Sequence, residues 1–524
     1  MNKNNNIFRE WVPRWLALII TGCILIISLL SFALYYSNMK STIGYYGFGQ
    51  ADVQFSVVIM YATVVTFLAL DSRLIKYFAA RRYITGGLIV NIISYIICFY
   101  TKDWFVFMAC RFVQGISCAL LCSAVMHLSF SLFRPSEARK YGYSLFYGGL
   151  QISIPVCAIY CTQTLRFLEF KHVFSLLCLF TLLMQLIVTL TMNKHGRFYR
   201  KFPLYQTDWK GGILYTVFCI LAGYILVYAR QFNGFGSMRF TALVALTGVA
   251  LCLLIAHEMK TKRPLINLRL FRYKGFIASL LLLAAFYIFK GTIIFVYNYA
   301  ETVLHVETEN MIPLWCINIA GVCTGTYLTA RYLTKKFSLH TIITGGFSLL
   351  GLFHLIICFI LSSRAEITDL YLPVYIYGLG TSTLFVPLVL FAVSSVPANL
   401  IPAVAPLGIF ARFTGFCISI CLNSYYHTFA KSPALAKCRA YIADGYYLLD
   451  ESLNQIRSFC NEIIYSSEYA ATHTDINFNK SVSDQLFIHS SINYFGLIFM
   501  TIAGFVLLLM MTTLTKRVVL RIRR

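Results

Sequence analysis

Long uninterrupted runs of apolar residues limit what this chain can fold into more than any other feature of its sequence. A run of about 20 apolar residues is long enough for a helix to cross the ~30 Å hydrocarbon core of a bilayer. Lipid offers the backbone no hydrogen-bond partner, and the runs are continuous rather than alternating in polarity, so helices are expected rather than barrel strands. The sequence therefore predicts an all-α integral membrane protein with about 14 transmembrane helices. The predicted spans lie near residues 15–36, 53–70, 83–100, 104–129, 142–164, 170–192, 211–229, 239–257, 275–297, 310–330, 340–362, 370–391, 403–425 and 490–514.

Charged residues are few and are concentrated between these runs. They make up 12% of the 524 residues, about half of the ~25% found in soluble domains. The net charge of +24 does not indicate a nucleic-acid partner, because no basic face is interleaved with stacking aromatic residues. Lys and Arg instead gather at both termini and in every second link between spans, which the positive-inside rule assigns to the cytoplasm. Both termini are therefore predicted to be cytoplasmic.

The 17 cysteines do not predict a metal centre. Most of them lie inside apolar runs and no CxxC pair occurs, so they are interpreted as small buried hydrophobic residues. No phosphate-binding loop is found, so neither ATP-driven pumping nor a bound cofactor is expected. Residues 426–489 are predicted to be a long, partly helical extracytoplasmic loop, in which Cys438 and Cys460 could form a disulfide.

A short repeat indicates that the chain is built from two related halves. Residues 74–87 read LIKYFAARRYITGG and residues 333–346 read LTKKFSLHTIITGG, and each segment links two predicted spans on the same side of the membrane. Two repeated halves are common in secondary transporters, where the substrate site lies at their interface near the bilayer midplane. We therefore expect six-helix halves over 1–192 and 275–524, with two inserted helices and their linkers over 193–274.

Four further segments carry a family resemblance. They are residues 71–82, the run from Arg111 to Gln114 with the following glycine, the sequence DWKG at 208–211, and the sequence PLINLRLF at 264–271. They resemble, in order, the loop between helices 2 and 3, the arginine motif of helix 4, the entry to the first inserted helix and the linker leaving the second inserted helix in the fourteen-helix EmrB/QacA-like subfamily of the major facilitator superfamily. The resemblance extends over nearly the whole membrane part, and it implies a divergent member of this subfamily.

This resemblance implies a major facilitator fold and secondary active export of drugs or metabolites. In the subfamily, export is usually driven in exchange for protons and sometimes requires a periplasmic adaptor protein. The implied location is the inner membrane of a bacterium.

The resemblance also assigns roles to residues, and the sequence departs from the family pattern at some of them. The cytoplasmic gate would contain Asp71, Arg73, Lys76, Arg81 and Arg82. Lys76 stands where the family usually has an acidic residue. The helix 5 antiporter signature is reduced to Pro155, without the glycines that normally accompany it. Antiport therefore follows less directly from the resemblance than membership of the superfamily does.

Three basic residues lie inside predicted spans, whereas every Asp and Glu falls at a span end or in a link. These residues are Arg111, Lys290 and Arg412. Charge inside a membrane is costly, so each is a candidate for substrate binding or coupling, together with Gln114 one turn after Arg111. If the three face one cavity, that cavity is positive and favours anionic or amphipathic anionic substrates. The competing interpretations are an anchor to backbone carbonyls for Arg111, a side chain that reaches the membrane surface for Lys290, and a position near a loop for Arg412.

Proton coupling requires a group that changes charge during transport. Glu301, at a span end, is the preferred carboxylate candidate, and His127 and His354 lie inside spans. A solvated charge at the membrane surface is the competing interpretation for Glu301, and a hydrogen-bonded packing role is the competing interpretation for the two histidines.

The sequence leaves several functions open. The leading one is a secondary active exporter of small amphipathic molecules that works by alternating access, with the bilayer, protons and a periplasmic adaptor docked on 426–489 as partners. An importer or facilitator on the same fold is the first alternative. A membrane-embedded enzyme would need a catalytic cluster, which 426–489 does not display. A transporter-like scaffold without transport activity is the last alternative.

Overall fold

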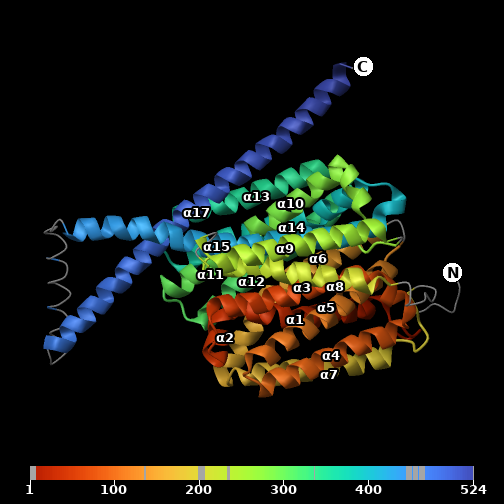
Figure 1. The fold of residues 1–524 in the computed structure, drawn as a ribbon, viewed down its shortest axis with the longest axis horizontal. Helices are drawn as coiled ribbons and strands as arrows, with labels where there is room; N and C mark the ends of the chain where they lie inside the picture. The colour runs from red at the N-terminus through yellow and green to blue at the C-terminus, as the bar shows by residue number, and fades with distance from the viewer. Residues whose placement is uncertain are drawn as a thin grey trace.

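The computed structural model of this chain describes residues 7–134, 137–198, 207–232, 236–261, 263–335, 337–443, 451, 458 and 467–522. Within these residues fourteen helices are long and apolar enough to cross a membrane, so the predicted all-α membrane fold is confirmed. Most of them run along a common direction in one bundle (Figure 1). The same residues contain no strand, apart from an isolated bridge between Phe8 and Met192.

The helices follow the predicted spans closely. Those of the first half are α1 (Arg14–Ser37), the short α2 (Met39–Tyr46), α3 (Gln50–Tyr77), α4 (Ala80–Tyr100), α5 (Trp104–Leu132), α6 (Ala138–Phe167) and α7 (Lys171–Thr191). The inserted pair is α8 (Trp209–Tyr228) and α9 (Met238–Lys260). Those of the second half are α10 (Lys274–Lys290), α11 (Ile293–Thr302), α12 (Ile312–Thr334), α13 (Leu339–Ile360), α14 (Tyr371–Ser394), α15 (Val404–Ala443) and α17 (Ser467–Ile522). Short 3-10 turns join several of them: η4 (Leu268–Arg272), η5 (Thr308–Met311), η6 (Ile367–Leu370) and η7 (Ala398–Ala403).

The two halves repeat one packing pattern. Helix α1 packs on α6 as α10 packs on α15, α3 on α5 as α12 on α14, and α4 on α7 as α13 on α17. The repeated sequence falls at the matching place in each half, across the α3–α4 link and the α12–α13 link. The last glycine of each copy also has an equivalent neighbour, since Gly87 lies against Leu121 of α5 and Gly346 against Leu384 of α14. The repeat therefore reports a real duplication of the helix arrangement, while the residue limits of the three predicted domains stay a prediction.

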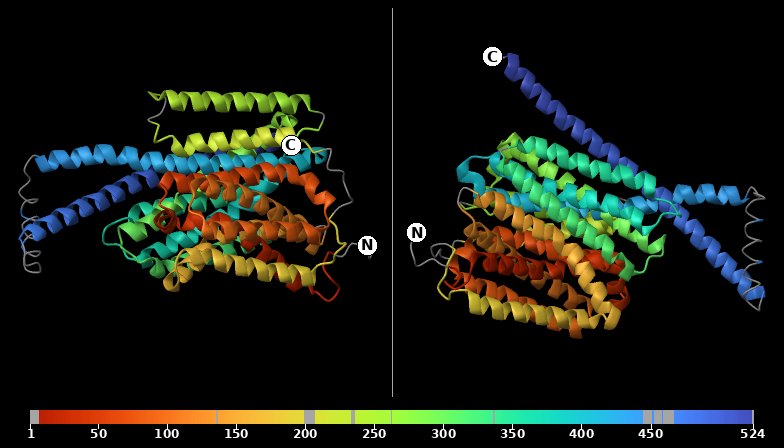
Figure 2. Two further views of the ribbon diagram at one scale, coloured as in Figure 1. Left: turned by 60° about the horizontal axis from the view of Figure 1, so that its bottom comes forward. Right: turned by 180° about the vertical axis from the view of Figure 1, so that it is seen from behind.

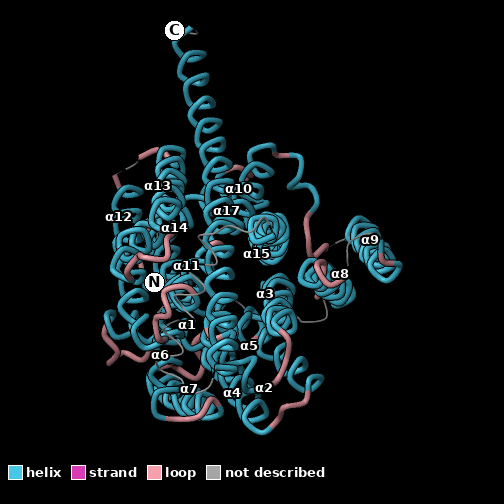
Figure 3. Tube along the Cα trace, turned by 90° about the vertical axis from the view of Figure 1, so that its left-hand side faces the viewer, coloured by secondary structure: helices cyan, strands magenta, loops and turns pink. Residues whose placement is uncertain are grey.

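The inserted helices lie outside this duplicated core. Helix α8 packs on α3 and α15, and α9 packs on α8. Figure 3 shows α9 at the edge of the bundle with α8 between it and the other helices, and the left view of Figure 2 shows the pair on one side of the molecule. Asp208 fixes the start of α8, because its Oδ1 accepts a hydrogen bond from the Gly211 backbone N–H at 3.0 Å. The pair therefore covers the seam between the halves from one side without entering it.

We call the end of the bundle where α1 ends and α3 begins the outer end, and the end where α3 meets α4 the inner end, following the predicted orientation. At the inner end α3 continues to Tyr77 and α4 begins at Ala80. The predicted gate loop 71–82 is therefore wrong in its extent. Asp71 and Lys76 lie in α3, and Arg81 and Arg82 lie in α4. The backbone of Arg73 is helical, and its side chain lies outside the described residues.

The long segment 426–489 is helical in much of its described part. Helix α15 continues to Ala443 and α17 begins at Ser467. Both project beyond the outer end of the bundle (Figure 1). The side chain of Cys438 and the whole of Cys460 lie outside the described residues, so the disulfide stays a prediction.

Candidate functional site

A cavity of about 870 Å³ lies between the two halves. Its walls come from α1, α3, α5 and α6 on one side and from α10, α11, α12, α14 and α15 on the other. The lining runs from Lys40 and Glu301 at the outer end to Lys76, Arg139 and Pro402 near the inner end. Its volume is within the ~300–1,000 Å³ range of small-molecule sites. The geometry is that expected for a central substrate site between repeated halves.

Arg412 enters this cavity from α15. It is 7% exposed, and its Nε donates a hydrogen bond to the Gly408 carbonyl of its own helix at 3.2 Å. Its guanidinium carbon lies 5.5 Å from the ring centres of both Tyr147 and Phe385. Electron-rich ring faces at this distance attract a cation, which lowers the cost of burying the charge. Helix α15 comes this close because of Gly415, where a Cβ would lie 2.4 Å from the Ala284 carbonyl oxygen of α10.

Lys290 enters from the last turn of α10, at a break in the first span of the second half. The break falls at Gly291 and Thr292, where a single continuous span was predicted. A side chain at Gly291 would overlap Ser419 of α15, and the Gly291 carbonyl accepts a hydrogen bond from Asn423 Nδ2 at 3.2 Å. The break is thus held against α15, and it places the Lys290 side chain at the cavity wall.

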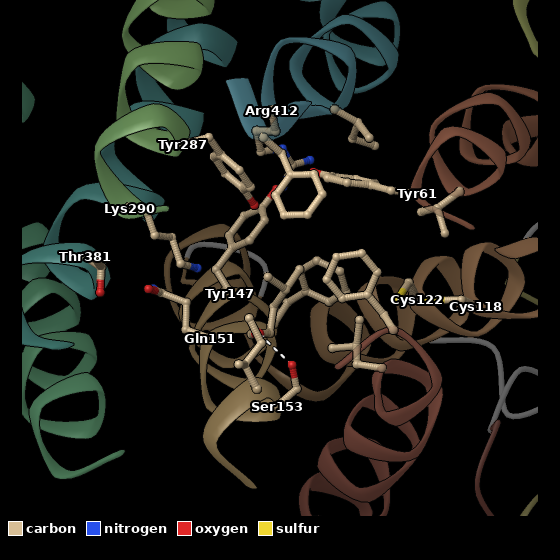
Figure 4. Close-up of a pocket in the computed structure, with 18 of the residues that line it drawn as sticks. Tyr61, Cys118, Cys122, Tyr147, Gln151, Ser153, Tyr287, Lys290, Thr381 and Arg412 are labelled. Atoms are coloured by element: carbon tan, nitrogen blue, oxygen red, sulfur yellow. Dashed lines mark hydrogen bonds between the residues drawn. The ribbon is translucent and has the colours of Figure 1, made fainter. Parts of the chain in front are cut away.

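The surroundings of the Lys290 ammonium are aromatic. Its Nζ lies 5.7 Å from the centre of the Tyr287 ring and 6.0 Å from that of Phe385. The Arg412 guanidinium lies over the same Phe385 ring, at 5.5 Å from its centre. In Figure 4 Lys290 points toward Gln151 of α6, across the interface between the halves. Gln151 is 5% exposed, and its Oε1 has no hydrogen-bond partner among the described residues.

Aromatic rings surround the two cations and continue across the interface. The Tyr147 and Phe385 rings stack at 4.4 Å, although they belong to different halves. The ring centre of Tyr61 on α3 lies 5.5 Å from the ring centres of both Phe413 and Phe416 on α15. Figure 4 shows Tyr61, Tyr147 and Tyr287 gathered around Arg412. The arrangement is a polar, positively charged centre inside an aromatic wall.

The structure does not bring Arg111 into this cavity. Its Nη1 donates to the Ser31 carbonyl at 2.7 Å and to Gln114 Oε1 at 2.6 Å, and its Nε donates to the Ser56 carbonyl at 3.3 Å. Its guanidinium also lies 4.3 Å from the Tyr35 ring centre. Arg111 and Gln114 therefore connect α5 to α1 and α3 inside the first half. This is the geometry of an anchor to backbone carbonyls, and coupling through these residues stays a prediction.

Glu301 lies at the outer end of the cavity, in an ion pair between the halves. Its Oε1 is 2.9 Å from the Nζ of Lys40 on α2. A second pair between the halves lies at the same end, with 3.5 Å between Arg166 Nε and Glu309 Oε2. Among the described residues, the remaining ion pairs join residues of one half or of the inserted pair. Ion pairing between the halves is therefore concentrated at the outer end.

The predicted gate residues lie near the inner end and have different surroundings. Asp71 is 1% exposed and accepts a hydrogen bond from the Tyr83 hydroxyl of α4. Asp71 and Lys76 both line the cavity. Arg81 is half-buried and Arg82 is exposed, and neither lines it. Pro155 is buried inside α6 and lines the cavity.

Sequence reasoning missed Tyr147 and Gln151. A signal for them exists, since Tyr143, Tyr147 and Gln151 recur every four residues and so share one face of the helix. All three line the cavity.

Comparison with known families accounts for this arrangement. A family model described as Major Facilitator Superfamily matches residues 21–420, more than half of the 524 residues. The chain belongs to the major facilitator superfamily. It is therefore a secondary transporter of small molecules embedded in a membrane, and the prediction that it is not an enzyme is confirmed by its family. No curated protein matches the sequence significantly.

Solved structures share this fold at low sequence identity. A bacterial homologue of the human lysosomal transporter Spinster, in an inward-facing and unoccupied conformation, gives a TM-score of 0.57 at 12% identity over 96% of this chain and 98% of that one. A peptide transporter POT in complex with sulfate gives 0.55 at 16% identity over 95% of each chain. The human organic anion transporter TETRAN gives 0.51 at 13% identity over 78% of this chain and 94% of that one. At these identities the likeness shows the fold alone.

Proposed function

We propose that this transporter exports small amphipathic molecules by alternating access around the cavity between its halves. The observation that carries the proposal is the asymmetry of the cavity. The Lys40–Glu301 and Arg166–Glu309 pairs, which join the two halves, both lie at its outer end, and the cavity lining extends from there to Arg139 and Pro402 at the inner end. This is a state that can load a solute from the cytoplasm.

The wall of the cavity supports an amphipathic cargo. Tyrosine and phenylalanine rings supply apolar faces, while Lys290, Arg412 and Gln151 supply polar groups at mid-span. Small-molecule sites commonly combine a mainly apolar wall with a few converging polar groups that set orientation. A drug or metabolite with a flat apolar part and one polar part fits this description.

The subfamily resemblance supports the direction of transport and the location. The segments at 208–211 and 264–271 resemble the boundaries of the inserted helix pair in the EmrB/QacA-like exporters, and two helices, α8 and α9, lie between them. On this basis we place the protein in the inner membrane of a bacterium, with both termini in the cytoplasm. We propose that a periplasmic adaptor docks on the segment 426–489, whose described helical parts project beyond the outer end of the bundle.

We further propose that protons drive the export and that Glu301 takes part in the coupling. Protonation of Glu301 would remove its charge and weaken the pair with Lys40 that closes the outer end. The protonation state of this carboxyl group would thus be linked to the conformation of the transporter, as coupling requires.

The test uses inside-out membrane vesicles that contain the protein, energised to make their lumen acidic, with a fluorescent amphipathic solute outside. Export predicts that the solute accumulates in the lumen and is released when an uncoupler collapses the gradient. An importer would move the solute out of preloaded vesicles instead, and a facilitator would move it without regard to the gradient. Absence of movement with every solute would contradict the proposal and favour a scaffold without transport activity.

A further inference from the structure

The two cations at the centre of the cavity lack an acidic partner. Lys290 and Arg412 both lie over the Phe385 ring, at 6.0 and 5.5 Å from its centre, yet neither forms an ion pair with a carboxylate among the described residues. Two like charges that lie close together repel one another, and the largely buried Arg412 has also lost part of its hydration. Charged residues at membrane depth are normally paired with one another or with backbone carbonyls. Arg412 donates one hydrogen bond to the Gly408 carbonyl, but no negative charge among the described residues balances either cation. The arrangement therefore leaves room for a negative charge supplied from outside the chain.

The acidic residues of the cavity wall are engaged elsewhere. Glu301 pairs with Lys40 at the outer end, and Asp71 accepts from the Tyr83 hydroxyl near the inner end. The basic residues of the wall outnumber these two acids: Lys40, Lys76, Arg139, Lys290 and Arg412. The cavity as a whole is thus positive, and its centre is the part without a compensating carboxylate.

The groups around the cations define the rest of the ligand. The stacked rings of Tyr147 and Phe385 lie 5.5 Å from the Arg412 guanidinium, and Tyr287 lies beside Lys290. Such ring faces and edges pack well against another flat ring. Gln151 adds a nine-tenths buried amide with a free acceptor, facing Lys290.

We propose that this cavity binds an aromatic monoanion, with its carboxylate or sulfonate between Lys290 and Arg412 and its flat ring among Tyr147, Tyr287 and Phe385. This inference rests on the proposed function only in naming the bound molecule as cargo. The planar fork of Arg412 matches the two oxygens of a carboxylate, and Lys290 adds a second positive charge. Because Gln151 and Tyr147 come from the first half and the two cations from the second, the bound anion would touch both halves. A ligand held in this way is placed to influence the relative position of the halves.

The test is a binding measurement on the purified full-length protein in a neutral detergent. Three probes share one ring system and differ in charge: 2-naphthoate, 2-naphthylmethanol and 2-naphthylmethylammonium. Titration calorimetry is expected to give an affinity for 2-naphthoate at least about 10-fold higher than for either of the other two, because a charged hydrogen bond is worth about that factor or more. Equal or tighter binding of the alcohol or the ammonium probe would overturn the proposal.

Substitutions locate the anion. Arg412→Gln is expected to weaken 2-naphthoate binding about 10- to 100-fold while changing the affinity for the alcohol less than about threefold. Arg412→Lys keeps the charge without the fork and should show a smaller loss, which also guards against misfolding as the explanation. Arg331→Gln, at an exposed site on the last turn of α12 outside the cavity, is the matched control and should bind like the wild type. Unchanged 2-naphthoate binding in both Arg412→Gln and Lys290→Met would overturn the proposal.

Two further competitors test whether the bound anion must be aromatic and whether it could be a lipid headgroup. Dodecanoate carries the same acid group on an alkyl chain, so binding as tight as that of 2-naphthoate would overturn the aromatic part of the proposal. Phosphatidylglycerol added in mixed micelles with the same detergent should not compete with 2-naphthoate, and strong competition would assign the site to a lipid headgroup. Since binding is measured without transport, absence of transport would leave a positive result intact. Export of a cation by a protein that does not bind 2-naphthoate would overturn this inference alone.

Discussion

Breaking the Lys40–Glu301 pair should shift the transporter toward the state that is open at its outer end. The Nζ–Oε1 distance is 2.9 Å, and the side chains are 57% and 31% exposed. At this separation two unit charges attract by about 1.4 kcal/mol in water, which salt at physiological strength reduces to about 1 kcal/mol. Ordering two long side chains costs part of this, and measured exposed pairs contribute about 0.2–1 kcal/mol. We expect a contribution near the upper limit, which corresponds to a factor of about 5 in the ratio of closed to open outer ends.

The assay is a distance distribution from pulsed electron paramagnetic resonance. Spin labels are attached through unnatural amino acids, since the chain has 17 cysteines, and one label is placed near the outer end of each half. Lys40→Gln should raise the long-distance population about two- to fivefold. The charge exchange Lys40→Glu with Glu301→Lys should restore much of the wild-type ratio.

The matched control is Lys171→Gln. Lys171 pairs with Glu169 at 2.8 Å, but both residues belong to the first half, so its loss should leave the distribution unchanged. A Lys40→Gln protein with the wild-type distribution, or a charge exchange that behaves like the sum of its single substitutions, would refute the role of this pair in closing the outer end.

Three further predictions concern stability and the division of roles, each measured by thermal or denaturant unfolding in detergent. Gly321→Ala should lower the free energy of unfolding by about 1–3 kcal/mol, because its Cβ would lie 2.4 Å from a backbone carbonyl oxygen of α14. Gly345→Ala should be neutral or stabilising by up to ~1 kcal/mol, because a Cβ at Gly345 would have no atom of a neighbouring helix within 4 Å. Equal losses of stability in the two variants would contradict the packing argument. Arg111→Met should lower the free energy of unfolding by about 2–3 kcal/mol through lost charged hydrogen bonds. It should leave the affinity for 2-naphthoate within about threefold of the wild type, and a larger loss of affinity would show that Arg111 contributes to the site. Thr292→Val removes the hydroxyl that lies 2.9 Å from His354 Nε2 at the helix break and should cost about 1–3 kcal/mol, whereas Thr292→Ser should cost much less.

The membrane spans could be predicted from the sequence because span length is a local property. A segment must be apolar over about 20 residues whatever it packs against, so all fourteen spans were located from hydropathy. The duplication could also be predicted, since the two copies of the short repeat cross equivalent links, α3–α4 in the first half and α12–α13 in the second. Helix ends were less predictable, and α3 extends two turns beyond its predicted end because apolar residues such as Leu74 and Ile75 allow the helix to continue.

Which residues line the site depends on tertiary structure, so these residues could be predicted only in part. Arg111, Lys290 and Arg412 look alike in sequence, each a single basic residue in an apolar run. Helix packing gives them different surroundings. Gly115 brings α5 close enough to α3 for Arg111 to reach a backbone carbonyl of α3. Lys290 and Arg412 instead face the cavity. The break at Gly291 depends on contacts with α15, so the sequence of α10 alone does not reveal it.

Counterflow in proteoliposomes tests the central claim most directly. Liposomes containing the purified protein are loaded with an unlabelled probe and diluted into a trace of the same labelled probe, with no ion gradient, first with 2-naphthoate and then with 2-naphthylmethylammonium. A transporter that works by alternating access should accumulate the labelled probe transiently above its external concentration for at least one of the two. Movement of both probes no faster than in protein-free liposomes, or simple equilibration without overshoot, would contradict the account.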